Sequence, residues 1–190
     1  MNIKSLKIEF IKISKRYNKQ WIFKNYSNEI NNSKINYLIA ENGAGKSTLI
    51  KIILNLVDYK GEIKTTIKTK TYVPEKINLP YFIKVEDFFN LINLNNDRKD
   101  ELITKFKIDE NKKIKELSKG MKQKIILIQA IAKDVDAYFF DEPLNGLDDD
   151  SINLFIDEIN KLHQNGKFIL ISTHQFQRFN GLLNNIVKIN

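Results

Sequence analysis

Cysteine is absent from this sequence of 190 residues, which excludes disulfide bonds and metal sites built on thiolates. The two histidines, His163 and His174, are too few to form a zinc site by themselves. With 3 prolines and 7 glycines, the chain has no proline- and glycine-rich linker, and it shows no repeat or low-complexity tract. A chain of this length without such boundaries is expected to form one domain, with room for a small insertion.

Long hydrophobic runs are missing as well. No run of roughly 18 apolar residues occurs, so we expect no segment that spans a membrane. Residues 1–5 are followed by mixed charge rather than by the apolar core of a signal peptide, so we expect the protein to stay inside the cell. Hydrophobic residues still make up 42% of the chain, which is enough for a sizeable buried core.

Positive charge is in excess, with 31 Lys and Arg against 23 Asp and Glu and a formal net charge of +8. Such a charge is typical of proteins that bind nucleic acid or anionic membrane surfaces. The basic residues are almost all lysine, however, and they are scattered without a long block. Because asparagine and isoleucine are also abundant, the pattern favours a general composition bias, and we expect no nucleic-acid partner.

Hydrophobic periodicity predicts alternating strands and helices. Strands are expected at 3–13, 35–39, 137–140, 167–172 and 185–189, with two short β stretches within 61–73. Helices are expected at 46–56, 118–132 and 149–164, and residues 85–107 are helical in pattern. The alternation predicts an α/β fold with a parallel core sheet. The helical stretch that interrupts it is expected to form an inserted subdomain at approximately 78–132.

A glycine-rich loop joins the strand at 35–39 to the helix that follows it. Gly43 and Gly45 let successive backbone N–H groups curve around a phosphate, and the start of the helix adds its positive end. The Lys46 ammonium can reach the terminal phosphates, and the Ser47 hydroxyl can bind Mg²⁺. We therefore predict a phosphate-binding loop made by Ala40, Glu41, Asn42, Gly43, Ala44, Gly45, Lys46, Ser47 and Thr48.

Ala40 stands where the first glycine of this loop pattern is usual. Its methyl group costs little if φ is negative, and about 1 kcal/mol if φ is positive. Because the two glycines nearest the phosphates are kept, we expect phosphate binding to survive.

Two carboxylates follow the buried strand at 137–140. Asp141 lies at its carboxyl end, where α/β folds bind ligands, and can hold Mg²⁺ through water opposite Ser47. Glu142 can reach a water molecule near the terminal phosphate and accept its proton. An ordinary strand end is the alternative, but the phosphate loop upstream favours the functional interpretation.

Several further motifs resemble those of ABC ATPases and occur in the order typical of that family. Residues 117–124, with the sequence Leu-Ser-Lys-Gly-Met-Lys-Gln-Lys, resemble the signature motif, and 144–148 resemble the D-loop. Residues 172–174, Ser-Thr-His, resemble the H-loop. Tyr17 resembles the aromatic residue that stacks on adenine, although a core aromatic is its alternative. The resemblance to the ATP-binding subunit of an ABC transporter covers nearly the whole chain.

The resemblance implies a P-loop NTPase core sheet with an antiparallel β subdomain and the inserted helical subdomain. It also implies ATP and Mg²⁺ as cofactors, with ATP between the phosphate loop of one subunit and Ser118 and Gly120 of another. His174 would contact the terminal phosphate and place the attacking water, and Lys46 and Glu142 would complete the catalytic group.

Three departures from the family pattern lie close to these positions. Lys119 replaces the first glycine of the signature motif, and Met121 replaces its final glutamine. Glu75 stands where the Q-loop usually has glutamine. Glu75 keeps an oxygen for Mg²⁺ or water but adds a negative charge near the phosphates, which can slow hydrolysis or alter coupling to a partner.

The resemblance implies an ATPase that energises a separate membrane-spanning subunit from the cytoplasmic side, at the inner face of the cell membrane, without inserting into it. We expect a homodimer, one C-terminally short domain at 1–190, and export rather than import. A soluble ABC-type ATPase that acts on nucleic acid, a ribosome or an assembly complex is one alternative. A weakly active regulatory ABC subunit is another.

Overall fold

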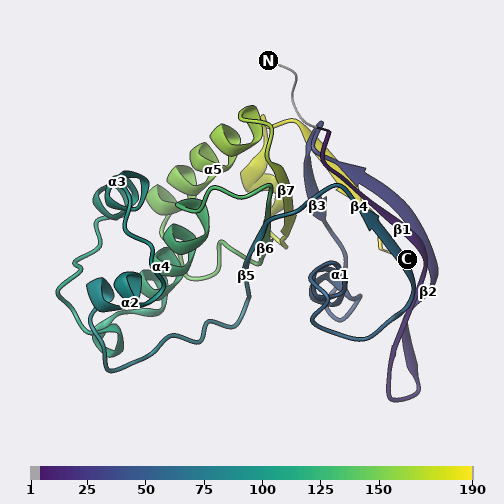
Figure 1. Ribbon diagram of the computed structural model, residues 1–190, viewed down its shortest axis with the longest axis horizontal. Helices are drawn as coiled ribbons and strands as arrows, with labels where there is room; N and C mark the ends of the chain where they lie inside the picture. Colours follow the sequence, from purple (N-terminus) through teal and green to yellow (C-terminus); the bar gives the residue numbers. More distant parts are fainter. Residues whose placement is uncertain (1–4, 190) are drawn as a thin grey trace.

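The computed structural model describes residues 5–189, which form two β-sheets and a group of helices (Figure 1). In chain order the elements are β1 (Lys7–Tyr17), β2 (Gln20–Asn31), β3 (Ile35–Leu38), α1 (Lys46–Ile53), β4 (Lys60–Thr65), β5 (Lys70–Val73), α2 (Val85–Leu91), α3 (Asp97–Lys105), the 3-10 helix η1 (Ile114–Glu116), α4 (Lys119–Ile131), β6 (Ala137–Asp141), α5 (Asp149–Gln164), β7 (Phe168–Ser172), the 3-10 helix η2 (Phe176–Phe179) and β8 (Asn184–Val187). The predicted strand at 3–13 begins outside the described residues.

A five-stranded sheet in the order β5-β6-β7-β3-β8 forms the centre of the fold, and its neighbouring strands run parallel to one another. Strands β6 and β7 are buried along their whole length. In β6, Tyr138 and Phe140 belong to the core on one face of the sheet, and Phe139 belongs to the core on the other. Burial on both faces explains why this strand reads as a continuous apolar run.

The second sheet is antiparallel, in the order β2-β1-β4, and α1 lies between it and the parallel sheet (Figure 1). Leu49 and Ile53 of α1 share one hydrophobic core with Phe10 of β1, Phe23 of β2 and Phe139 of β6. Helices α4 and α5 cover the opposite face of the parallel sheet, and α2 and α3 lie outside them. The predicted α/β class, with a parallel core, an antiparallel β part and inserted helices, is confirmed.

The stretch at 85–107, which is helical in pattern, forms two helices in the structure, α2 and α3. Asn93 adopts a left-handed φ of 52°, which ends the first helix. The side chain of Asn96 then caps the second helix by accepting a hydrogen bond from the Lys99 N–H at 2.7 Å. Two asparagines therefore divide this helical segment into two helices.

Other boundaries also differ from the prediction. Strand β1 extends to Tyr17 rather than ending at residue 13, and it forms a hairpin with β2, which the apolar pattern does not predict. Helix α1 ends at Ile53 rather than at 56, and Asn55 beyond it has a left-handed φ of 55°.

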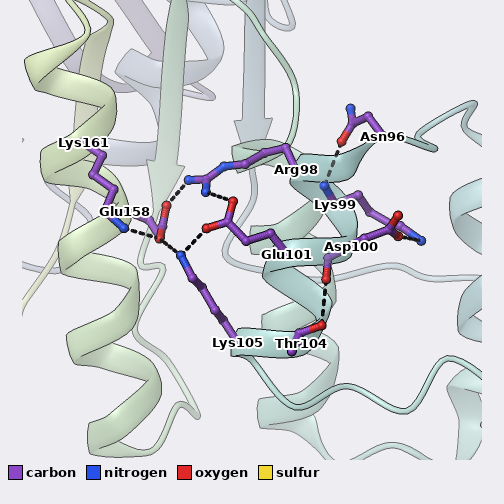
Figure 2. Close-up of polar contacts among 9 residues, drawn as sticks. All are labelled: Asn96, Arg98, Lys99, Asp100, Glu101, Thr104, Lys105, Glu158 and Lys161. Atoms are coloured by element: carbon purple, nitrogen blue, oxygen red, sulfur yellow. Dashed lines mark hydrogen bonds and ion pairs between the residues drawn. The ribbon is translucent and has the colours of Figure 1, made fainter.

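A buried carboxylate joins the inserted helices to the core (Figure 2). The side chain of Glu158 in α5 is 0% exposed, and it accepts hydrogen bonds from Lys105 at 3.1 Å, Lys161 at 2.9 Å and Arg98. Arg98 and Lys105, both on α3, also bind Glu101. Burial alone raises the pKa of Glu158, but the hydrogen bonds from Lys161 and Lys105 and the charge of Arg98 outweigh it, so the pKa lies below its usual value.

We predict that Glu158→Gln lowers the free energy of unfolding by about 1–3 kcal/mol, because it removes the one charge that three cations share. The cost stays below that of a fully buried pair because Arg98 and Lys105 are about one-third exposed and can turn to water. Glu101→Gln is the matched control, with a side chain that is 45% exposed, and it is expected to cost about 0.5 kcal/mol or less. Urea unfolding measures both values, and equal losses would contradict the account.

Candidate nucleotide-binding site

A cavity of about 190 Å³ lies at the carboxyl ends of β3, β6 and β7. The residues that line it are Glu41, Asn42, Gly43, Gly45, Lys46, Ser47, Thr48, Glu75, Asp141, Glu142 and His174. The register explains why they meet, since Leu38 pairs with Ser172 and Ser172 pairs with Asp141 across neighbouring strands. Loops that leave one edge of a parallel sheet are thereby brought to one place.

The loop between β3 and α1 needs glycine at two positions for different reasons. Gly45 has a φ of 104°, and a Cβ there would lie 2.4 Å from Ile22 Cγ2 and 3.0 Å from the ring of Phe23. Gly43 has a φ of 81° with open space around it. Helix α1 starts directly after Gly45 with no side-chain cap and no acidic residue in its first turn. Its first N–H groups are therefore free to bind an anion.

Lys46 is a buried cation that has no carboxylate partner among residues 5–189. It is 7% exposed, and its ammonium donates to the carbonyl oxygens of Ala40 at 2.8 Å and Glu41 at 3.3 Å. The Nζ atom also lies 3.4 Å from Nε2 of His174. Because a buried charge is stabilised by an opposite charge, this arrangement favours an anionic ligand in the cavity. Ala40 has no left-handed φ, so the missing glycine causes no strain there.

Asp141 is buried at 2% exposure and held by two hydroxyl groups. Ser172 Oγ donates to its Oδ1, and the Tyr72 hydroxyl donates to its Oδ2 at 3.4 Å. Burial and the charge of Asp141 both raise the pKa of Tyr72, so its hydroxyl stays a donor. Tyr72 and Ser172 were not predicted as site residues, although Ser172 lies in the H-loop-like motif at 172–174. Their hydroxyl groups are the signal that could have found them.

Glu142 has the features of a general base. It adopts a left-handed φ of 50°, which is rare for a residue with a side chain. Its Oε2 accepts from the His174 N–H at 3.3 Å, and its Oε1 lies 3.2 Å from Nε2 of His174 without a well-aligned hydrogen bond. Burial raises the pKa of Glu142, and the charges of His174 and Lys46 only partly oppose this. A carboxylate with a raised pKa and an unsatisfied oxygen can accept a proton from water.

The oxygen donors in the cavity suit Mg²⁺ when phosphate is present. Ser47, Glu75 and Asp141 all line it, and Mg²⁺ prefers oxygen ligands. Within 5–189 no group of three His, Cys, Asp or Glu side chains could hold a metal ion by itself. The site therefore fits a Mg²⁺ ion that is completed by phosphate oxygens and water.

Ser118 and Gly120 do not line this cavity. Ser118 caps α4, and its Oγ accepts from the Met121 N–H at 3.2 Å. A Cβ on Gly120 would lie 2.3 Å from the carbonyl oxygen of Gly146, so the signature-like loop packs directly against the D-loop-like turn. Glycine at 120 is therefore required by packing within the chain, in addition to any contact with a ligand.

Three other predicted residues also lie outside the cavity lining. Ala40 contributes only its carbonyl oxygen, through Lys46, and Ala44 is not among the lining residues. Tyr17 is 44% exposed at the end of β1, and the Lys15 ammonium lies 4.8 Å from the centre of its ring.

A larger cavity, of about 800 Å³, lies elsewhere in the described part of the chain. Its lining includes Asn32, His163 and Leu183, which lie near the amino ends of β3, β7 and β8. Parallel α/β sheets bind ligands at the opposite edge, where the 190 Å³ cavity and its charged groups are found.

Comparison with known proteins gives consistent matches. The family model described as ABC transporter matches residues 23–145. An uncharacterised ABC transporter ATP-binding protein of Methanocaldococcus jannaschii is 32% identical over 192 residues, covering 95% of this chain and 73% of that protein. The zinc import ATP-binding protein ZnuC of Acinetobacter baylyi is 32% identical over 187 residues, covering 93% and 72%. A solved ATP-binding subunit of an ABC transporter superposes with a TM-score of 0.85 at 25% identity, covering 96% of this chain and 85% of that chain.

The two glycines of the loop give a direct test of its geometry. We predict that Gly45→Ala lowers the free energy of unfolding by about 2–4 kcal/mol, through backbone strain and the collision with Ile22. Gly43→Ala is the matched control, with strain but no collision, and is expected to cost about 1 kcal/mol. Both are measured by urea unfolding without ligand, and a larger loss for Gly43→Ala would refute the packing around Gly45.

Proposed function

Because the chain belongs to the ABC transporter family, as an ATP-binding subunit that hydrolyses ATP with Mg²⁺, we propose that two copies close on two ATP molecules and drive a separate membrane-spanning protein. The observation that carries this proposal is that the residues expected to contact ATP lie in two separate places in the chain. The cavity contains a buried lysine with no carboxylate partner among residues 5–189, and three side chains that offer oxygen ligands, whereas Ser118 and Gly120 lie outside it. Such a half-site is completed by the same loop of a second copy.

Five residues of the cavity have a chemical role in this proposal. Lys46 neutralises the terminal phosphates, together with the free N–H groups at the start of α1. Ser47 and Asp141 hold Mg²⁺, directly or through water, and bound Mg²⁺ neutralises charge on the phosphate oxygens. Glu142 takes the proton of the attacking water, and His174 holds that carboxylate in place through its N–H.

The remaining predicted residues act outside the phosphate cavity. Ser118 and Gly120 contact the terminal phosphate bound to the other copy, at the start of α4, where the helix dipole favours anions. Tyr17 stacks on adenine, since its ring is partly exposed. The helical subdomain at 78–132, which includes α2, α3 and α4, belongs to a single domain at 1–190 in this proposal.

The proposal also covers where the chain acts in the cell and the direction of transport. No helix in the described part of the chain is long and apolar enough to cross a membrane. We propose a place at the inner face of the cell membrane, bound to the membrane-spanning partner. Export is the direction that the form of the signature motif favours, although one relative is named as a zinc import protein.

Purification of the tagged full chain from detergent-solubilised membranes tests this proposal. We expect a membrane-spanning protein to co-purify in about equal amounts, and the complex to release phosphate from Mg·ATP. Glu142→Gln is expected to keep that partner and bind ATP while phosphate release falls about 100-fold or more, because the base is lost.

Two outcomes of this experiment would contradict the proposal. If Glu142→Gln releases phosphate at the wild-type rate, Glu142 is not the general base. If the chain instead purifies with RNA or DNA and without a membrane protein, and high salt releases the nucleic acid, the soluble alternative is favoured.

A further inference from the structure

Two of the departures from the family pattern lie in one groove. This groove, of about 510 Å³, lies beside the phosphate cavity and contains Glu75 and Lys119. Its complete lining is Glu75, Lys76, Ile77, Tyr81, Lys119, Lys122 and Asn145. Glu75 adds a negative charge and Lys119 adds a positive one, so the two changes are opposite in sign at one place.

The other lysines at the start of α4 already have partners. The Lys122 ammonium lies 5.1 Å from the centre of the Tyr81 ring, and Lys124 binds Asp148 at 3.0 Å. Lys119 instead runs along the backbone at Gly146, where a Cβ added to that glycine would lie 3.6 Å from Lys119 Cγ and 3.7 Å from its Cδ. Its ammonium has no ion pair within 4.0 Å among residues 5–189, and the Glu75 carboxylate has none either in that range.

Glu75 lines both the groove and the phosphate cavity. Its carboxylate can therefore turn toward the phosphates or toward α4. A negative charge beside a triphosphate is unfavourable, and a nearby cation reduces that repulsion. Lys76 also lines the groove, but it is carried by the same loop as Glu75 and cannot connect that loop to α4.

We propose that Lys119 is a positioning residue that pairs with Glu75 across the groove and makes an acid tolerable at this position. The pair connects the loop after β5 to the start of α4. The inference rests on the proposed use of the cavity for ATP. It differs from a role in which Lys119 touches the phosphate bound to a second copy.

A double-mutant cycle separates these two roles. Lys119→Gln, Glu75→Gln and the double variant are compared in the full chain carrying Glu142→Gln, so that ATP persists during equilibrium binding. We expect Lys119→Gln to raise the Kd of Mg·ATP about three- to fivefold when Glu75 is present, and less than about twofold when Glu75→Gln is also present. The Kd of Mg·ADP should change less than about twofold in both, because the repulsion acts on the terminal phosphate.

Two further variants serve as controls for this cycle. Lys119→Arg keeps the charge, so the Kd of Mg·ATP should stay close to its value with Lys119 in place. Lys76→Gln removes a charge from the same groove and should show no coupling to Glu75→Gln.

Equal losses from Lys119→Gln in both backgrounds would overturn the inference and favour direct contact with phosphate in the second copy. Losses of the same size for Mg·ADP would overturn it as well, since they indicate a general structural effect. If the chain binds no ATP at all, the proposed function fails too, whereas ATP binding with additive losses overturns only the role of Lys119.

Discussion

The parallel register of β6, β7 and β3 is the constraint on which the rest of the site depends. Asp141 pairs with Ser172, and Ser172 pairs with Leu38, so three strands end in one row. The phosphate loop, Glu142 and His174 all lie just beyond that row. The register is stabilised by burial on both faces, since strand β6 contributes Phe139 to one hydrophobic core and Phe140 to the other. A shift of one residue would turn each of these side chains to the opposite face.

The charged side chains of Lys46 and Glu142 are arranged to interact with a ligand. Lys46 is buried against carbonyl oxygens, and Glu142 has a raised pKa and one oxygen without a hydrogen bond. Both groups are less favourable without an anion and a water molecule than with them. By contrast, Glu158 is buried with three cations and has a lowered pKa, which is what a purely structural carboxylate requires. The two carboxylates thus differ in environment in the way that the proposed role of Glu142 and the structural role of Glu158 require.

Much of the fold could be predicted because its core strands are buried on both faces and its helices are amphipathic. Strand β2 was missed because most of its 12 residues are at least partly exposed, so no apolar run marks it. The loop glycines and Lys46 could be predicted from their spacing between a strand and a helix. The contact from Tyr72 to Asp141 was not, because it depends on β5 lying beside β6, a pairing between distant segments. The buried state of Glu158 likewise depends on α3 packing on α5.

The central claim is that each chain carries half of the ATP site. Mixing two inactive variants tests it most directly: Lys46→Ala, which disables the phosphate cavity, and Ser118→Arg, which blocks the signature-like loop. In a symmetric dimer, half of the pairs in an equal mixture are mixed, and each mixed pair keeps one intact site. We therefore predict that the mixture recovers about a quarter of wild-type phosphate release. No recovery, or full activity of Ser118→Arg alone, would contradict the account.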